Sequence, residues 1–265
     1  MGALVGKVAL VTGASRGVGK GIALGLGEQG ATVYVTGRTE TGGATPTPLP
    51  GTVQETAAEV SALGGRGVAI GCDHRDDEQT RAAVRRVVEE AGRLDVLVNN
   101  VWGGYEYFWD GTPFWTEAGF WTQPIERWDS AFQAGVRAHY LTSVAAVPTM
   151  VSQGSGLIVT VSSEGAEKVD TGVAYGAAKA ASDHMIACMA NELRDHGVTA
   201  VSLYPGLVRT ESVLRAAEYI DLTHSESPLF VGRAVAALAA DPAVERHTGQ
   251  VVRTSALAEE YGFTE

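Results

Sequence analysis

Short β-branched runs alternate with longer alanine-rich stretches, and this alternation restricts the fold more than any other feature of the sequence. The runs are almost continuously apolar, as is typical of strands buried on both faces of a parallel sheet. The predicted strands are Val8–Thr12, Thr32–Thr36, Gly67–Ile70, Val96–Asn99, Gly156–Val161 and Val198–Tyr204, and the predicted helices are Gly19–Gly27, Val53–Leu63, Glu78–Ala91, Trp128–Val151 and Ala174–Asp195. Alternating strands and helices predict an α/β fold, namely a single Rossmann-type, doubly wound parallel sheet with helices on both faces.

The chain of 265 residues is expected to form one domain, 1–265, because it contains no internal repeat and no Ser/Pro-rich linker. A chain of this length buries roughly 70–75% of its unfolded surface and needs no disulfide or metal to hold it together. Thr39–Gly51 is rich in Gly, Pro and Thr and is expected to be an exposed loop. Thr52 and Glu55 have the spacing of a capping box, and Asp76 is expected to cap the next helix.

Charge and cysteine content restrict the partners and the compartment. A formal net charge of −11 opposes binding to nucleic acid. The two cysteines, Cys72 and Cys188, form no ligand cluster, so we expect no metal site and a reducing compartment. The segment after Met1 lacks the features of a signal peptide, and no apolar run approaches the ~18–20 residues of a membrane span. We therefore expect a cytoplasmic protein with neither a membrane nor a nucleic acid as partner.

A glycine-rich segment, from Thr12 to Gly19, lies between the first predicted strand and the first predicted helix. Glycines there permit a tight turn and let backbone N–H groups approach a pyrophosphate at the helix N-terminus. The spacing is GxxxGxG, which differs from the GxGxxG of the common dinucleotide fingerprint. Because the segment joins a strand to a helix, we predict that it binds a nucleotide cofactor. The residues assigned to this contact are Gly13, Ser15, Arg16, Gly17, Val18 and Gly19.

The end of the second strand indicates which cofactor is bound. Enzymes that use NAD usually place an acid there, roughly 20 residues after the glycines, to bind the ribose hydroxyls. Here the strand ends at Gly37-Arg38 with no acid. Arg38 and Arg16 would flank a 2′-phosphate as charge-assisted donors, and the alternative is that both are ordinary solvated charges. We predict NADP(H), with NAD(H) as the second candidate. Asp73, after the third strand, either contacts the adenine edge or only flanks the next helix.

Tyr175 and Lys179 lie four residues apart in a predicted helix, so their side chains share one face. A free tyrosine titrates near ~10. A neighbouring ammonium favours the phenolate and lowers the pKa of the tyrosine toward that of a useful acid/base. Such a pair is common on helices, so the pair alone indicates little.

The order of five features along the chain is far more specific. They are the glycine turn, Asn99-Asn100, Ser162-Ser163, the pair Tyr175/Lys179, and the segment from Pro205 to Thr210. Together they resemble the short-chain dehydrogenase/reductase family across essentially the whole chain.

The resemblance implies a role for each matching residue. Tyr175 would donate or accept the proton of the substrate oxygen, while Lys179 would bind the nicotinamide ribose and lower the pKa of Tyr175. Ser163, twelve residues before Tyr175, would hydrogen-bond the carbonyl oxygen. Asn99 would steady the central sheet beside the cofactor. The loop that contacts the nicotinamide half would contain Pro205, Gly206 and Thr210.

Two positions depart from the family pattern. The long middle helix usually carries a catalytic Asn where this chain has Gly135, although glycine keeps the backbone carbonyl and tolerates a kink. His139, one turn later, either substitutes for that Asn or has a structural role, which we favour. Trp102 stands where the family usually has Gly, and it either narrows the pocket or begins a rearranged loop. These departures, together with the stretch from Val136 to Tyr140, most resemble a subgroup called dehydrogenase/reductase member 1.

Ten aromatic residues lie in the segment from Val101 to Trp128, Trp128 included, in an insertion at about 101–128 with no helical or strand period. The insertion follows the fourth strand, at the edge of the sheet where ligands bind in open α/β folds. We hypothesise a lid that selects a small-molecule carbonyl or alcohol with a bulky apolar body, and the alternative is a self-packed loop or a subunit interface. The alanine-rich helices also suit close packing between subunits, so a homodimer or homotetramer is expected.

The sequence therefore predicts an NADP(H)-dependent oxidoreductase that interconverts a carbonyl and a secondary alcohol. Two alternatives stay open because fold does not fix function. One is an NADPH-binding sensor or scaffold with impaired catalysis, which Gly135 motivates. The other is a dehydratase, epimerase or enoyl reductase of the same fold.

Overall fold

The computed structural model describes residues 2–43, 45, 47–104 and 119–265. Within these residues the strands form one parallel sheet in the order β3-β2-β1-β4-β5-β6-β7. The chain turns back between β1 and β4, so the sheet is doubly wound, as the sequence predicts. The strands are β1 (Val8–Val11), β2 (Thr32–Gly37), β3 (Arg66–Gly71), β4 (Val96–Asn99), β5 (Gly156–Val161), β6 (Val198–Tyr204) and β7 (Val251–Arg253).

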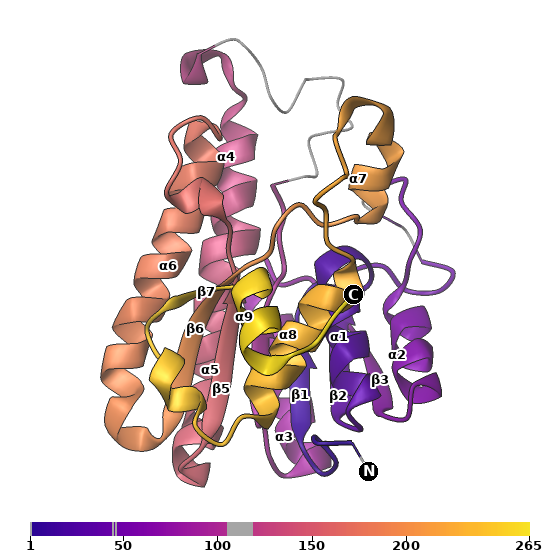
Figure 1. Ribbon diagram of the computed structural model, residues 1–265, viewed down its shortest axis with the longest axis vertical. Helices are drawn as coiled ribbons and strands as arrows, with labels where there is room; N and C mark the ends of the chain where they lie inside the picture. Colours follow the sequence, from indigo (N-terminus) through magenta and orange to yellow (C-terminus); the bar gives the residue numbers. More distant parts are fainter. Residues whose placement is uncertain (1, 44, 46, 105–118) are drawn as a thin grey trace.

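Helices cover both faces of this sheet (Figure 1). One layer contains α1 (Gly17–Glu28), α2 (Val53–Ala62), α8 (Pro228–Ala240) and α9 (Thr254–Tyr261), and the other contains α3 (Asp77–Ala91), α5 (Ala138–Gln153) and α6 (Val173–Leu193). Two short helices, α4 (Ile125–Ala131) and α7 (Glu211–Arg215), lie beyond the carboxyl ends of the strands (Figure 1). In the part of the chain that the structure describes, no helix combines the length and the apolar content that crossing a membrane requires.

The two faces of β1 show why its sequence is apolar throughout. Ala9 and Val11 belong to the core beneath α1 and α8, whereas Val8 and Leu10 belong to the core beneath α3 and α5. Successive side chains of a strand point to opposite faces, so a strand covered on both faces needs apolar residues at every position. The prediction of a buried parallel sheet from continuous apolar runs is confirmed.

Two predicted helix starts are confirmed in detail. Thr52 Oγ1 accepts from the Glu55 N–H at 3.1 Å, and the Glu55 carboxylate accepts from the Thr52 N–H at 2.9 Å. Asp76 caps α3 by accepting from the N–H groups of Glu78 and Gln79. The two reciprocal bonds satisfy backbone donors that the first turn of α2 leaves without intrahelical partners.

The predicted helix Trp128–Val151 is present, but it is not a regular α-helix throughout. A π-helical turn, Phe132–Arg137, separates α4 from α5 while the chain continues in the same direction. Gly135 lies inside this turn and is buried. Such turns insert one extra residue into a helical path and are frequent at functional sites.

Two of the elements not predicted from the sequence are α8, which packs beside α1, and β7, which forms the edge of the sheet next to β6. A signal for α8 was present, because Ser227 precedes Pro228 and its hydroxyl accepts from the Phe230 N–H at 3.0 Å. Serine at the N-cap followed by proline is a strong helix start. The strand β7 has only three residues, which is too short for a period to be recognised.

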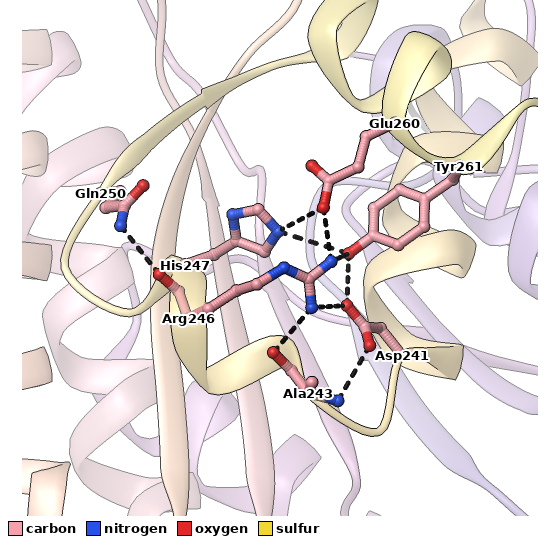
Figure 2. Close-up of polar contacts among 7 residues, drawn as sticks. All are labelled: Asp241, Ala243, Arg246, His247, Gln250, Glu260 and Tyr261. Carbon is pink, nitrogen blue, oxygen red and sulfur yellow. Dashed lines mark hydrogen bonds and ion pairs between the residues drawn. The ribbon is translucent and has the colours of Figure 1, made fainter.

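A polar cluster joins α9 to the end of α8 and to the segment before β7 (Figure 2). Arg246 contacts the carboxylates of both Asp241 and Glu260. Tyr261 donates to Asp241 at 2.6 Å, and His247 lies 3.4 Å from Glu260. Because the cluster links groups on three segments, it holds the C-terminal helix against the sheet.

A buried carboxylate fixes the amino ends of β1 and β4. Asp95 is 6% exposed and accepts from the Val8 N–H at 2.9 Å, from Lys7 at 3.2 Å and from both ends of the Arg93 guanidinium. Burial alone would raise the pKa of Asp95, but these hydrogen bonds, led by that of Arg93, lower it below its usual value. The ionised form is therefore stabilised by folding.

We expect Asp95→Ala to lower the free energy of unfolding by roughly 2–3 kcal/mol, because it leaves a buried N–H group without its acceptor. Since the folded-state pKa lies below the unfolded one, this contribution is complete above about pH 4 and is lost as the pH falls through the folded-state value. Urea unfolding from pH 7 to pH 3 measures it. Asp195→Ala, at an exposed acid, is the control. Equal losses in the two variants would contradict the assignment.

Candidate active site at the carboxyl edge of the sheet

The turn between β1 and α1 requires glycine at several positions. Gly13 and Gly17 have φ values of +65° and +59°, a region that L-residues with side chains rarely adopt. A Cβ atom on Gly13 would lie 2.7 Å from the Val101 Cα, and one on Gly19 would lie 2.4 Å from the Gly13 carbonyl oxygen. The turn therefore brings bare backbone to the edge of the sheet, which is the cradle that a pyrophosphate needs.

The N-terminus of α1 binds an anionic group of this chain. The Gly17 N–H donates to the Glu211 carboxylate at 2.9 Å, and no side chain caps the helix at Arg16. The Thr210 side chain lies beside the same position, 3.4 Å from where a Cβ of Gly17 would be. Because helix N-termini favour negative charge, the geometry fits a phosphate group at the place where Glu211 now lies. Glu211 was not among the predicted site residues.

Arg16 and Arg38 lie close enough to influence each other. Burial lowers the pKa of Arg16, the Glu211 carboxylate partly offsets this, and the charge of Arg38 lowers it further. Arg16 donates to the Pro50 carbonyl at 2.9 Å and to the Gly51 carbonyl at 2.8 Å, so it also anchors the loop after β2. Two cations at one edge of a glycine turn would be stabilised by a dianion between them.

The remaining residues predicted for the adenosine half lie around this turn. Ser15 is buried against Gly37, and Val18 packs onto the core. Asp73 lies at the end of β3, where its carboxylate accepts a forked pair of hydrogen bonds from Arg75, the shorter at 2.6 Å. Burial raises the pKa of Asp73, but the Arg75 contacts outweigh this and the net shift is downward.

Two asparagines tie β4 to its neighbours. Asn99 is fully buried, and its amide nitrogen donates to Ser143 of α5 at 2.9 Å and to Thr160 of β5 at 3.4 Å. Asn100 donates to the backbone carbonyls of Thr12 and Gly13, both at 2.9 Å. Asn99 thus steadies the sheet, whereas Asn100 fixes the glycine turn. Asn100 belonged to the recognised motif but was not predicted as a site residue.

Ser163 and Tyr175 meet although they come from different elements. Ser163 follows β5, Tyr175 lies in the first turn of α6, and the Tyr175 hydroxyl donates to Ser163 Oγ at 2.8 Å. Ser163 Oγ also accepts from the Gly165 N–H at 3.1 Å. Because Oγ accepts twice, its own proton remains to be donated to a third oxygen.

Lys179 lies one turn further along α6, on the face that carries Tyr175. Its ammonium donates to the Val161 carbonyl at 3.1 Å and lies 5.7 Å from the centre of the Tyr175 ring. Burial lowers the pKa of Lys179 to about 8, with Asp183 acting in the opposite direction. The spacing of four residues therefore places phenol and ammonium together, as the sequence predicts.

The loop after β6 closes the site on its other side. The Gly206 N–H donates to the Glu226 carboxylate at 3.1 Å, and Thr210 caps α7. Pro205 is the first residue beyond β6. The predicted residues of this loop thus lie at the carboxyl edge of the sheet, and Thr210 lies beside the N-terminus of α1.

His139 is buried, and its Nε2 lies 2.8 Å from the Val101 carbonyl oxygen. Burial, together with the charge of Lys179, lowers the pKa of His139 to about 3, so the ring is neutral. These contacts fit the structural role favoured for it. The lid hypothesis depends on residues 105–118, which lie outside the described residues.

Comparison with known proteins agrees with this arrangement. A family model described as short chain dehydrogenase matches residues 7–219. The Mus musculus protein "Dehydrogenase/reductase SDR family member 1" is 42% identical over 272 positions, which cover 97% of this chain and 82% of that protein.

Two solved structures share the fold and contain nicotinamide cofactors. A 7α-hydroxysteroid dehydrogenase complexed with NADH and 7-oxo glycochenodeoxycholic acid has a TM-score of 0.78 at 25% identity, covering 94% of this chain and 93% of that one. A metagenomic short-chain oxidoreductase in complex with NADP has a TM-score of 0.73 at 30% identity, covering 95% of this chain and 98% of that one. The family model extends through β1 to β6, the glycine turn and the Tyr175 helix, and the mouse relative covers nearly the whole chain. This chain is therefore a member of the short-chain dehydrogenase/reductase family of oxidoreductases.

Proposed function

We propose that the protein interconverts a carbonyl and a secondary alcohol on a bulky apolar substrate, with NADP(H) as cofactor. The observation that carries the proposal is the 2.8 Å contact between the Tyr175 hydroxyl and Ser163 Oγ, with Lys179 one turn away. An oxygen atom within about 3 Å of both hydroxyls would accept two hydrogen bonds, one from Ser163 and one from Tyr175 once the Tyr175 proton turns from Ser163 toward it. This is the arrangement that a carbonyl needs when negative charge develops on its oxygen.

The side chains divide the proton chemistry between them. Ser163 would orient and polarise the carbonyl oxygen, and Tyr175 would donate its proton to that oxygen, or accept it in the alcohol direction. Lys179 would favour the phenolate electrostatically. The nicotinamide would supply or accept the hydride, and the glycine turn, the N-terminus of α1 and the loop from Pro205 to Thr210 would hold the two halves of the cofactor.

NADP(H) is proposed over NAD(H) because Arg16 and Arg38 lie together at the adenosine edge, and because the residue directly after β2 is Arg38 and not an acid. One structural relative was solved with NADP and another with NADH, so the fold accepts either. A 2′-phosphate would relieve the repulsion between the two guanidinium groups, which an unmodified ribose would not.

The substrate class follows from the aromatic wall of the site. The Trp102 ring lies 5.5 Å from the Tyr175 ring and is nearly perpendicular to it. A relative that acts on a hydroxysteroid shows that the fold admits a bulky alicyclic body. We therefore propose ketones and secondary alcohols with aromatic or alicyclic groups as substrates.

We also propose a cytoplasmic homodimer or homotetramer that binds neither nucleic acid nor membranes. The acidic net charge opposes binding to nucleic acid. The exposed apolar residues Tyr140 and Val144 on α5 support self-association through that helix. Native mass spectrometry tests the oligomeric state.

The test is NADPH and NADH oxidation by the purified protein with a panel of bulky ketones, diketones and quinones. Alcohol formation that consumes NADPH in equal amount supports the proposal. Tight NADPH binding without turnover would favour a sensor or scaffold. A product other than the alcohol, or turnover without net NADPH consumption, would favour a dehydratase, epimerase or enoyl reductase.

Glu211→Gln is expected to tighten NADPH binding by about threefold to tenfold, because it removes a carboxylate that competes with a phosphate for the N-terminus of α1. The amide oxygen can still accept from the Gly17 N–H, so the loop keeps its contact. Isothermal titration with NADPH measures the change. Glu218→Gln, at an exposed acid nearby, is the control. Weaker binding in Glu211→Gln would show that the carboxylate helps to hold the cofactor.

A further inference from the structure

Among the residues that the structure describes, Trp102 has the aromatic ring nearest to the Lys179 ammonium. Lys179 Nζ lies 4.3 Å from the Trp102 ring centre, closer than to the ring of Tyr175 at 5.7 Å. The same indole meets the Tyr175 ring at 5.5 Å and 80°. One side chain therefore contacts both members of the pair to which the proton chemistry is assigned.

Gly135 provides the space that the indole occupies. A Cβ atom on Gly135 would lie 2.8 Å from Cζ3 and 2.9 Å from Cε3 of Trp102, closer than real Cβ contacts allow. Gly135 is buried inside the π-helical turn, and its Cα faces the Trp102 ring. Any side chain at this position would displace the indole from Lys179.

His139 fixes the backbone beside the indole. A carbonyl oxygen can only accept, so the 2.8 Å contact requires His139 Nε2 to carry the proton and donate it to the Val101 carbonyl. Burial and the Lys179 charge keep the ring neutral, with its pKa lowered to about 3. The residue before Trp102 is thus tied to α5 by a hydrogen bond that does not change over the working pH range.

We propose that Trp102 is a positioning residue for Tyr175 and Lys179: its indole, seated on Gly135 and tied through Val101 to His139, holds the Lys179 side chain as a dry ammonium beside the phenol. The effect of Trp102 on catalysis rests on the proposed carbonyl chemistry. The contacts of its indole with Lys179 and Tyr175 do not depend on that proposal. An aromatic face attracts a cation, more strongly when water is excluded.

A small change around Lys179 can change its charge state near neutral pH, so the neighbouring indole can influence how much of it is protonated. Burial lowers the pKa of Lys179 to about 8, and the other described groups that act on it are Asp183 and Tyr175 on α6 and the neutral His139 on α5. The Asp183 carboxylate accepts a hydrogen bond from the Tyr204 hydroxyl. Loss of the aromatic face would lower the pKa of Lys179 further, by about one unit, because the ammonium alone interacts with the ring.

The first experiment compares Trp102→Leu with Trp102→Phe. We expect Trp102→Leu to move the alkaline limb of the kcat profile down by about one pH unit, with up to about a tenfold loss above pH 8 and little loss below pH 6.5. Trp102→Phe should keep most of the wild-type profile because it keeps an aromatic face. Phe230→Leu is the matched control, since it removes an aromatic ring of α8 that packs on Phe263, with the ring centres 5.2 Å apart. A Trp102→Leu profile of unchanged shape, lowered equally at every pH, would overturn the proposal.

The second experiment tests the seat of the indole. Gly135→Ala should lower kcat by about tenfold when Trp102 is present, because the added methyl group overlaps the ring. In the Trp102→Leu background the same substitution should cost less than about twofold, since the smaller side chain leaves room. Equal losses in both backgrounds would show that Gly135 acts independently of Trp102.

A measurement without substrate separates this proposal from the proposed function. The phenolate titration of Tyr175, followed by ultraviolet absorbance as the difference between each protein and its Tyr175→Phe counterpart, reports on the Lys179 charge directly. Its midpoint should rise in Trp102→Leu and should not change in Phe230→Leu. If no ketone is turned over but the midpoint rises, the proposed function fails and the positioning role stands. An unmoved midpoint in an active enzyme would overturn only the positioning role.

Discussion

Tyr175→Phe is expected to lower kcat/KM by about 10²–10⁴-fold, the usual contribution of a positioned general acid/base. The Tyr175 hydroxyl is the only group removed, and its 2.8 Å contact with Ser163 places it where the substrate oxygen must gain or lose its proton. The ring remains to pack against Trp102 and Gly165, so the fold and the NADPH dissociation constant should change little. Stopped-flow kinetics with NADPH, together with titration of NADPH binding, measure both quantities.

Tyr140→Phe is the matched control for this experiment. Tyr140 lies on α5 and is 56% exposed, so loss of its hydroxyl should leave kcat/KM within about twofold. If Tyr175→Phe instead retained most of the wild-type rate, proton transfer would not pass through this phenol. The chemistry would then have to be assigned to another group, and the alternative reactions of the same fold would become the leading candidates.

Arg38→Leu is expected to raise the KM for NADPH by about 10–100-fold and to leave the KM for NADH within about threefold. A hydrogen bond to a charged group contributes about 1.5–3 kcal/mol, which corresponds to this range. Arg38 follows β2, where it acts electrostatically on Arg16 at the adenosine edge. Only a cofactor with a 2′-phosphate would use that pair, so the loss should be selective. Initial rates over a range of each cofactor measure it.

Arg66→Leu removes the same charge from the opposite, amino-terminal edge of the sheet, because Arg66 is the first residue of β3. It should leave both KM values unchanged, which separates a local contact from an effect of net charge. An equal rise for NADPH and NADH in Arg38→Leu would mean that Arg38 serves the loop and not a 2′-phosphate. A preference for NADH in the wild type would remove the basis of the NADP(H) proposal.

Local patterns determined the strands and most of the helices. A strand buried on both faces must be apolar at nearly every position. The continuous apolar runs at β1, β4, β5 and β6 therefore predict these strands without any other information. The capping box at Thr52 and the cap at Asp76 are likewise local, because each joins residues two or three positions apart. The π-helical turn that interrupts the long helix could not be predicted from the sequence, since a single glycine at position 135 does not change the helical spacing of the apolar residues around it.

The same division applies to the site. The sequence by itself determined Tyr175 and Lys179, because a spacing of four residues on a helix fixes their common face, and the order of five motifs determined the family. Only the tertiary structure decided that Glu211 lies at the N-terminus of α1, a contact between residues 194 positions apart, and that Trp102 is seated on Gly135. Such pairs leave no local signature, because their partners come from different elements and meet only when the sheet brings its carboxyl ends to one edge. The spacing of residues along one element is fixed by backbone geometry, whereas complementarity between elements depends on how the whole core packs.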